Sequence, residues 1–299
     1  MTDIQIIDLN FLNLSDAIAS FLIPSDDGLI LIESGPETTF STLKNSIAKT
    51  GYQPEDVKHV LLTHIHFDHA GAAWKFAEQG AKIYVHPIGL PHLQNPERLW
   101  NSAKQIYGDS METLWGTMKP IPSEKLIAAE DGNHLKIGQH QFKVHETPGH
   151  AIHHNAYQLG DVIFTGDVAG IKIKNGPITP PCPPPDIDLG AWKKSIEKLK
   201  ALKADKLVLT HFGMVENPEE HLTALEIILD DWAAWMKPYY EAGESPESNT
   251  PKFIAYTNNQ LYEAGVSKKD VERYDKANPS WMSVKGLLRY WKLKDQGRL

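Results

Sequence analysis

The chain has 299 residues, of which 41% are hydrophobic and 23% charged, and its formal net charge is −8 at pH 7. This composition is typical of a globular protein that buries one substantial core or two small ones. The negative charge argues against a nucleic-acid surface, which needs a basic stripe opposite the phosphates, and the mean hydropathy of −0.37 argues against a membrane protein.

The cysteine content and the first residues indicate a cellular compartment. The single cysteine, Cys182, excludes an internal disulfide and suits a reducing environment. Residues 1–4 lack the basic start of a secretory signal, and no long apolar run follows them. We therefore expect a cytoplasmic protein that binds neither nucleic acid nor membranes.

Short apolar runs alternate with helical patterns along the first part of the chain. Strands are predicted at residues 4–12, 17–23, 29–32, 60–63 and 82–86, and helices at 40–50 and 70–79. Gly51 is the expected end of the first helix, because glycine adopts the backbone conformation that stops a helix.

The run THIHFDHAG, residues 63–71, places three imidazoles and one carboxylate within six residues directly after a predicted strand. Imidazole and carboxylate are ligands of borderline divalent metals such as zinc. His64 and His66 project the same way from an extended chain, whereas Asp68 and His69 diverge once the chain turns. Two residues would serve one metal and two its neighbour. The alternative, a solvated histidine-rich turn, is disfavoured by the motifs that follow.

The second half of the chain repeats the pattern of strands and helices. Strands are predicted at 135–137, 142–144, 156–159 and 162–164, a helix at 189–202, and a further strand that ends at His211. His150, Asp167 and His211 each follow a short apolar or alternating run and are flanked by Gly or Thr, which permit a tight ligand loop. Two similar halves of this kind predict two packed sheets with helices outside.

Two segments lie outside this pattern. Residues 90–118 carry aromatic and methionine side chains at helical spacings, and they predict either a wall over the metal cleft or an appendage that packs on the body. In the first case Phe67, Tyr107 and Trp115 would contact the substrate, because small-ligand pockets are lined mostly by apolar side chains. Residues 219–299 predict a helical extension after a body of residues 1–218. This extension would pack on the body, contribute to the pocket or pair with a second subunit in a homodimer.

The four metal-loop motifs, in this order, resemble the metallo-β-lactamase superfamily over residues 28–213 and are similar to those of glyoxalase II and the lactonases. The resemblance implies an α+β fold, a four-layer αβ/βα sandwich, here with a C-terminal helical extension. It also implies two divalent metal ions, zinc in the first place, with iron and manganese as alternatives. Its ligands would be His64, His66 and His150 for one metal, Asp68, His69 and His211 for the other, and Asp167 as the bridge.

The resemblance further implies a hydrolase in which a metal-bridging hydroxide attacks a small acyl substrate, a thioester, ester or lactone. Asp68 would be the catalytic residue that orients the water, and His153 and His154 would support the ligands without binding metal. Glu33 stands where relatives usually carry Asp. A phosphodiesterase or nuclease of the same fold, an iron-dependent oxidoreductase and a binding protein are the alternatives. The acidic net charge disfavours the phosphodiesterase or nuclease. The full ligand set disfavours the oxidoreductase, and the intact hydrolytic site disfavours the binding protein.

Overall fold

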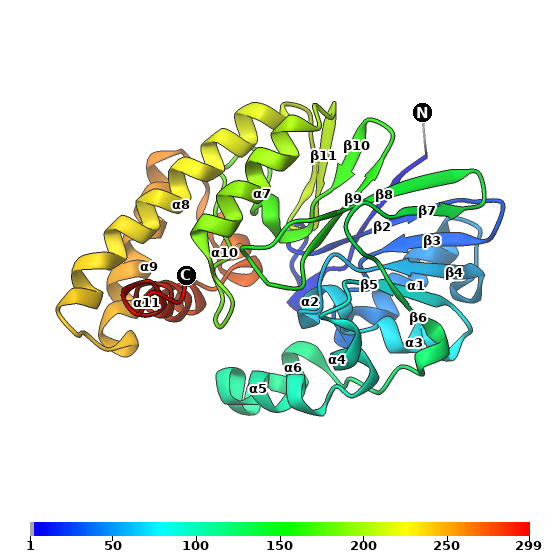
Figure 1. The fold of residues 1–299 in the computed structure, drawn as a ribbon, viewed down its shortest axis with the longest axis horizontal. Coiled ribbons are helices and arrows are strands. Elements are labelled where there is room, and N and C mark those ends of the chain that lie inside the picture. The colour runs from blue at the N-terminus through cyan, green and yellow to red at the C-terminus, as the bar shows by residue number, and fades with distance from the viewer. Residues whose placement is uncertain (1–2) are drawn as a thin grey trace. The chain divides into compact units, whose positions relative to one another are not determined.

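The computed structural model describes residues 3–299, and the chain divides into two compact units. The first unit comprises the chain up to Glu146 together with His153–Phe164, and the second comprises Thr147–Ile152 and Thr165–Leu299. Figure 1 labels α-helices and strands of both units. The domain boundary predicted at residue 218 stays a prediction.

A six-stranded mixed sheet belongs to the first unit. Its strands lie in the order β1-β2-β3-β4-β5-β6, with β1 to β3 antiparallel and β3 to β6 parallel. They are β1 (Gln5–Asp8), β2 (Ala19–Ile23), β3 (Leu29–Ile32), β4 (Val57–Leu61), β5 (Lys82–Val85) and β6 (Leu126–Ala128). Parallel strands are covered on both faces, which explains why every residue of β3 is buried.

Four antiparallel strands of the same unit form a second layer. They are β7 (His134–Ile137), β8 (His140–Glu146), β9 (Asn155–Leu159) and β10 (Val162–Phe164). The ring centroids of Phe21 and Phe164 lie 5.5 Å apart between the two layers. The Tyr157 hydroxyl donates a hydrogen bond to the Leu62 carbonyl at 2.9 Å. Apolar and polar contacts therefore both hold the layers together.

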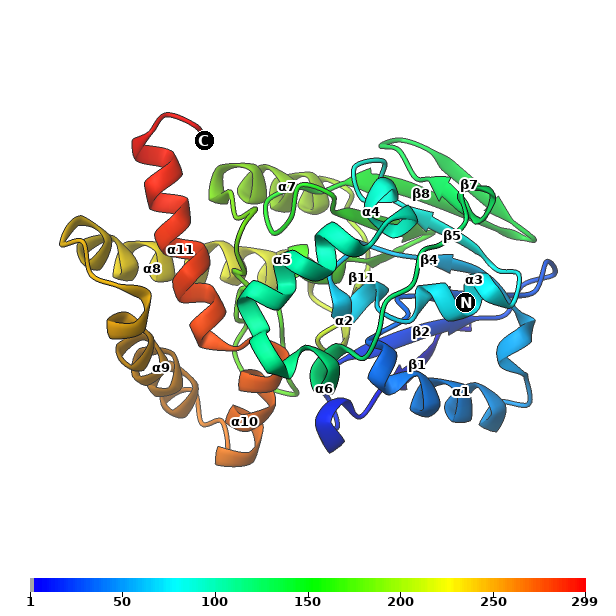
Figure 2. The same cartoon turned by 90° about the horizontal axis from the view of Figure 1, so that it is seen from below.

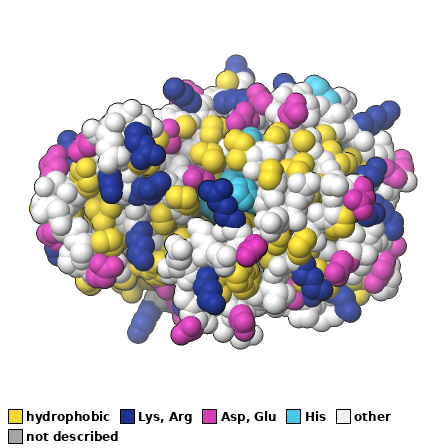
Figure 3. Space-filling model, turned by 60° about the horizontal axis from the view of Figure 1, so that its bottom comes forward, with side chains coloured by type: hydrophobic (Ala, Val, Ile, Leu, Met, Phe, Trp, Pro, Cys, Tyr) yellow, Lys and Arg dark blue, Asp and Glu magenta, His cyan; other side chains and the backbone are white. Residues whose placement is uncertain are grey.

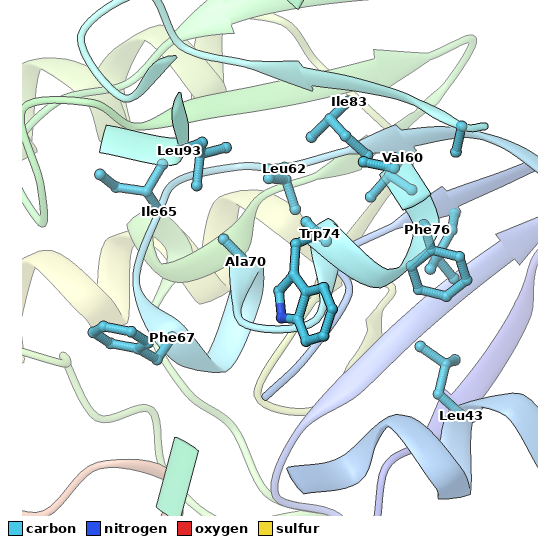
Figure 4. Close-up of a cluster of buried hydrophobic side chains, with 14 of the residues drawn as sticks. Leu43, Val60, Leu62, Ile65, Phe67, Ala70, Trp74, Phe76, Ile83 and Leu93 are labelled. Carbon is cyan, nitrogen blue, oxygen red and sulfur yellow. The ribbon is translucent and has the colours of Figure 1, made fainter. Parts of the chain in front are cut away.

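Helices α1 (Phe40–Lys49) and α3 (Ala73–Glu78) pack against the six-stranded sheet. Figure 4 shows Leu43 of α1 and Phe76 of α3 in one cluster with Val60 and Ile83 of the strands. Such burial of apolar side chains stabilises the layer. Short 3-10 helices occupy several connections: η1 (Phe11–Asn13), η2 (Glu37–Thr39), η3 (Pro54–Asp56), η4 (Gly108–Ser110) and η5 (Ser123–Lys125).

The strand predicted at residues 4–12 is shorter in the structure. It ends at Asp8, because Asn10 and Leu12 adopt left-handed backbone angles, with φ of 49° and 52°, in and before η1. A left-handed residue turns the chain out of an extended path. The alternating apolar pattern continues past this point, so the sequence alone does not reveal the turn.

The helical insertion predicted at 90–118 contains α4 (Leu90–Gln94), α5 (Glu97–Tyr107) and α6 (Met111–Trp115), which follow β5 in the chain (Figure 2). The chain then enters β6, which pairs with β5 at the edge of the sheet. The sequence does not predict β6, because three residues are too few to show an alternating pattern.

The second unit contains a hairpin and the helices of the C-terminal region. Its elements are η6 (Gly166–Ala169), α7 (Leu189–Ala201), β11 (Lys206–Leu209), β12 (Gly213–Val215), α8 (Pro218–Glu241), α9 (Pro246–Glu263), α10 (Lys268–Ala277) and α11 (Ser280–Asp295). β11 and β12 are antiparallel, and α11 packs against α8 and α9.

Capping residues explain where several of these helices begin. The Asp188 carboxylate accepts hydrogen bonds from the backbone amides of Gly190 and Ala191 at the start of α7. Ser245 and Ser267 cap α9 and α10 in the same way. No α-helix within residues 3–299 has a stretch that is long and apolar enough to cross a membrane.

Candidate metal centre

In the first unit, the histidine-rich run leaves the carboxyl end of β4 and turns into the short helix α2 (Phe67–Ala70). The amides of His69 and Ala70 donate to the His66 carbonyl at 3.0 and 2.8 Å. The helix predicted at 70–79 is therefore two helices. Between α2 and α3, the Ala72 amide donates to the Gly35 carbonyl at 2.9 Å and not to the preceding helix.

The ligand atoms of this loop lie close together. His64 Nε2 and His66 Nδ1 are 2.9 Å apart, and Asp68 Oδ2 is 3.6 Å from His69 Nε2. The ring centroids of His64 and His69 are 4.0 Å apart. His64 and His69 are fully buried, whereas His66 and Asp68 are partly exposed. Converging imidazole and carboxylate atoms of this kind suit divalent metal ions.

Glu33, directly after β3, holds the loop from within the core. Its side chain is fully buried, and Oε1 lies 3.1 Å from His69 Nδ1. The Thr63 hydroxyl donates to Oε1 at 2.5 Å, and the Thr63 amide donates to Oε2 at 3.3 Å. A carboxylate on one ring nitrogen orients the imidazole and leaves its other nitrogen for a metal. The longer Glu side chain thus still reaches His69.

His153 and His154 are buried in the first unit beside the loop histidines. The His154 ring centroid lies 5.0 Å from that of His64, and the His153 ring centroid lies 5.6 Å from that of His66. These positions suit side chains that restrain the ligand rings. Their supporting role stays a prediction.

The other three predicted ligands, His150, Asp167 and His211, belong to the second unit and are buried there. Asp167 Oδ2 lies 3.3 Å from His150 Nε2, and Asp167 Oδ1 lies 3.4 Å from His211 Nε2. Each carboxylate oxygen therefore faces a different imidazole. This is the arrangement that a carboxylate needs to contribute to two neighbouring metal sites.

The loop that carries His150 is fixed against α7. His150 Nδ1 donates to the Pro181 carbonyl at 2.8 Å, so Nε2 is the nitrogen that would bind a metal. Gly149 has φ of 134°, and a Cβ atom there would lie 2.2 Å from Trp192 Cα. Only glycine permits this close approach of the loop to the helix.

The sequence pattern does not single out His221, which supports the loop of Asp167. His221 lies on α8, is buried, and donates from Nε2 to the Ala169 carbonyl of η6 at 2.7 Å. Burial, with a smaller effect of the Lys172 charge, lowers the pKa of His221 to about 4. No local signal marks this residue, because its partner is far away along the chain.

The aromatic side chains of the insertion pack on the metal loop of the first unit. Phe67 makes an edge-on contact with Trp100 at 5.7 Å between ring centroids, and its ring lies 6.2 Å from Trp115. Tyr107 stands nearly perpendicular to Trp115 at 5.3 Å. Burial and the negative charge of Asp68 both raise the pKa of the Tyr107 hydroxyl. The insertion is thus beside the loop, while contact with substrate stays a prediction.

Charged side chains of both signs are mixed on the face drawn in Figure 3. Toward the left of this view several lysine and arginine side chains lie near one another, with apolar side chains around them.

The chain is similar in sequence and in fold to known proteins. The family model of the metallo-beta-lactamase superfamily matches residues 16–211. Over 186 residues, 60% of this chain and 70% of the relative, the chain is 31% identical to the metallo-beta-lactamase fold-containing protein ST1585 of Sulfurisphaera tokodaii. The crystal structure of ST1585 matches with a TM-score of 0.62 and 26% identity over 75% of this chain and 86% of that chain.

Two further comparisons agree. The probable metallo-hydrolase MJ0888 of Methanocaldococcus jannaschii is 25% identical over 156 residues, 50% of this chain and 69% of that protein. The metallo-beta-lactamase family protein TTHA1429 of Thermus thermophilus shares the fold, with a TM-score of 0.69 at 18% identity over 99% of this chain and 93% of that chain. The chain belongs to the metallo-β-lactamase superfamily of metallo-hydrolases, and it has the α+β fold of that superfamily with a helical C-terminal region.

Proposed function

We propose that this chain is a hydrolase that uses two divalent metal ions to cleave a small acyl substrate: a thioester, ester or lactone. Zinc is the first choice for both ions. Membership of the superfamily supports hydrolysis as the reaction. The observation that carries the proposal is Asp167, whose two carboxylate oxygens face His150 and His211 at 3.3 and 3.4 Å. One carboxylate shared in this way suits two metals that act together.

In this proposal His64, His66 and His150 bind one metal, Asp68, His69 and His211 bind the other, and Asp167 contributes to both. Five imidazoles and two carboxylates fit borderline divalent ions, and zinc, iron and manganese all accept such donors. When bound, the two ions supply a water whose pKa is near 7 and polarise the scissile carbonyl. A serine or cysteine nucleophile is then unnecessary.

The remaining roles fall to side chains around the ligands. Asp68, whose side chain is 20% exposed, is the catalytic residue that accepts a hydrogen bond from the attacking water and orients it. Glu33 keeps the His69 ring in its binding orientation through the 3.1 Å contact to Nδ1. Phe67, Tyr107 and Trp115 supply an apolar wall for the acyl group, which also excludes bulk water.

The partners follow from the same proposal. The substrate is a small molecule, because the aromatic wall provides apolar contacts for an acyl group. This wall contains no cationic side chains that would bind a polyanion. Neither nucleic acid nor a membrane is a partner in this proposal, and the net charge of −8 supports the first exclusion. Pairing of two chains through the C-terminal helices stays a prediction.

A substrate panel tests the reaction class. Protein loaded with zinc, iron or manganese in separate preparations would be assayed with thioesters, aryl esters, lactones and a phosphodiester. We expect turnover of at least one class of acyl substrate and no turnover of the phosphodiester. The net negative charge of the protein does not attract the negatively charged phosphodiester. Turnover confined to the phosphodiester would overturn the proposal.

Replacement of Asp68 tests the assigned catalytic role. We expect Asp68→Ala to lower kcat/KM by more than about 100-fold, because it removes both a ligand and the group that aims the water. Thermal unfolding of the metal-free variant should match that of the metal-free wild type, since the Asp68 side chain on α2 is partly exposed. His153→Ala and His154→Ala should lower activity less. Activity of Asp68→Ala within about tenfold of wild type contradicts the role.

A further inference from the structure

Trp115, the last residue of α6, has a buried indole nitrogen without a hydrogen-bond acceptor. The residue is 8% exposed, and among residues 3–299 nothing accepts a hydrogen bond from Nε1. Buried tryptophan N–H groups usually find a partner, because an unsatisfied donor destabilises the fold. An orphan donor beside a candidate active site therefore needs an explanation.

The indole is held in place on several sides. Its ring is nearly parallel to Phe11, with 5.5 Å between centroids and 12° between planes, and it also lies beside Phe67. On either side of it along the chain, the Leu114 carbonyl accepts from the Thr38 hydroxyl at 2.8 Å and the Thr117 carbonyl accepts from Trp74 Nε1 at 3.1 Å. The orphan donor is thus presented by a rigid element.

The neighbouring helix α5 is attached less firmly. It buries one of its eleven residues, Ala103, whereas α6 buries Met111 and Trp115 among five. Tyr107 at the end of α5 covers the indole edge-on. Gly108 follows with φ of 55°, a left-handed conformation that glycine adopts without strain, and a Cβ atom there would meet nothing within 4 Å. Because Nε1 is buried, a ligand would reach it only after a neighbouring ring such as that of Tyr107 moves aside.

We propose that the Trp115 N–H binds an oxygen atom in the acyl group of the substrate and selects substrates that carry one. The substrate class is an acyl compound with a largely apolar acyl group that bears an ether, keto or hydroxyl oxygen. This inference rests on the proposed function, because the acyl group of that substrate lies against Phe67 and the aromatic wall. The surrounding aromatic rings contact the apolar part of the acyl group. The enclosed N–H stabilises the bound state only when the acyl group carries a hydrogen-bond acceptor.

Matched thioesters test the selection. The panel contains the octanoyl thioester and analogues in which an ether oxygen replaces one methylene at successive positions of the chain. We expect the wild type to favour one analogue by about three- to tenfold in kcat/KM, the value of one enclosed neutral hydrogen bond. Trp115→Phe should bring that ratio to about one, because it keeps an aromatic ring and removes the donor.

Trp74→Phe is the matched control, because the Trp74 N–H already has the Thr117 carbonyl as its acceptor. This variant should lose thermal stability and keep the wild-type ratio. A wild type that favours none of the analogues, or a Trp115→Phe variant that keeps the preference, overturns the inference while leaving hydrolysis itself intact.

An NMR titration separates this inference from the proposed function. In protein labelled with ¹⁵N-tryptophan, the Trp115 N–H signal should move downfield on addition of the preferred oxygen-bearing acid and stay in place with octanoate. The signal is identified by its loss in Trp115→Phe, or by its proximity to the Tyr107 ring in the wild type if that variant does not fold. A shift in a protein that hydrolyses no thioester, ester or lactone of the substrate panel supports the Trp115 role and refutes the hydrolase. Absence of a shift with every acid refutes the Trp115 role.

Discussion

At the scale of single residues, three of the candidate ligands share one arrangement. His64 Nδ1 contacts the Thr63 hydroxyl at 3.0 Å, His69 Nδ1 contacts the Glu33 carboxylate, and His150 Nδ1 donates to the Pro181 carbonyl. In each case a polar neighbour contacts Nδ1, so Nε2 is the nitrogen that would bind a metal. These neighbours would therefore determine which nitrogen of each imidazole serves as a ligand.

Glu33 offers a direct test of this support. We expect Glu33→Gln to weaken metal binding by about 10- to 100-fold, because the amide loses the charge that stabilises the His69 ring. Competition with a chromogenic chelator measures the affinity. Glu55→Gln, an exposed carboxylate in η3, is the control and should bind metal like the wild type. Equal affinities for Glu33→Gln and the wild type would show that the contact is dispensable.

His221 gives a pH-dependent contribution to stability. Its pKa is lowered to about 4 by burial in the folded chain, against an ordinary value of 6.5. Below pH 6.5 the unfolded chain gains a proton that the folded chain does not. The free energy of unfolding therefore falls as the pH drops from 6.5 toward 4, by about 2 kcal/mol between pH 7 and pH 5. This contribution is fully present above pH 6.5.

Urea unfolding at pH 7 and pH 5 measures this contribution. His221→Gln keeps a donor for the Ala169 carbonyl and has no titrating ring, so its stability should depend less on pH than that of the wild type. His59 and His86, whose pKa values burial also lowers, are unchanged in the variant, and the difference between the two proteins isolates His221. Identical pH dependence would contradict the assignment.

At the scale of elements, the approach of the ligand loop to α7 depends on Gly149. A Cβ atom at this position would lie 2.2 Å from Trp192 Cα, a backbone atom that has little freedom to move. We expect Gly149→Ala to lower the free energy of unfolding by about 2–3 kcal/mol, because the side chain adds overpacking to an unfavourable φ. The displaced loop should also bind metal more weakly through His150.

Gly160→Ala is the matched control for this prediction. Gly160 also has a positive φ, 58°, yet a Cβ atom there would meet nothing within 4 Å. The Gly160→Ala substitution should therefore lower the free energy of unfolding by only about 1 kcal/mol, the effect of the unfavourable φ alone. Urea unfolding of both variants measures the difference. Equal losses would mean that the contact with Trp192 relaxes without resistance.

At the scale of the whole molecule, metal content tests the proposed pair of ions. We expect two metal equivalents per chain by elemental analysis, because the seven candidate ligands divide into two sets that share Asp167. Chelation should lower Tm, since a ligand that binds the folded chain at about 1,000 times its Kd stabilises it by about 4 kcal/mol. Metal content that saturates at one equivalent would contradict the two-metal proposal.

The sequence by itself predicted the candidate ligands and most strands. His64, His66, Asp68 and His69 are neighbours along the chain, so their spacing alone predicts a ligand loop. The runs that form β3 and β10 were predicted with the bounds that the structure has, because burial leaves a local apolar pattern. Local periodicity and composition suffice for such features.

Tertiary structure alone decided the contacts between distant segments. Glu33 reaches His69, His221 reaches Ala169, and Trp115 stacks on Phe11 across long stretches of chain. None of these pairs leaves a periodic signal, because each depends on how separate elements pack and not on the residues beside it. The same reason applies to β6, whose three residues become a strand through pairing with β5. The unsatisfied N–H of Trp115 is likewise a property of its surroundings, which only the folded chain defines.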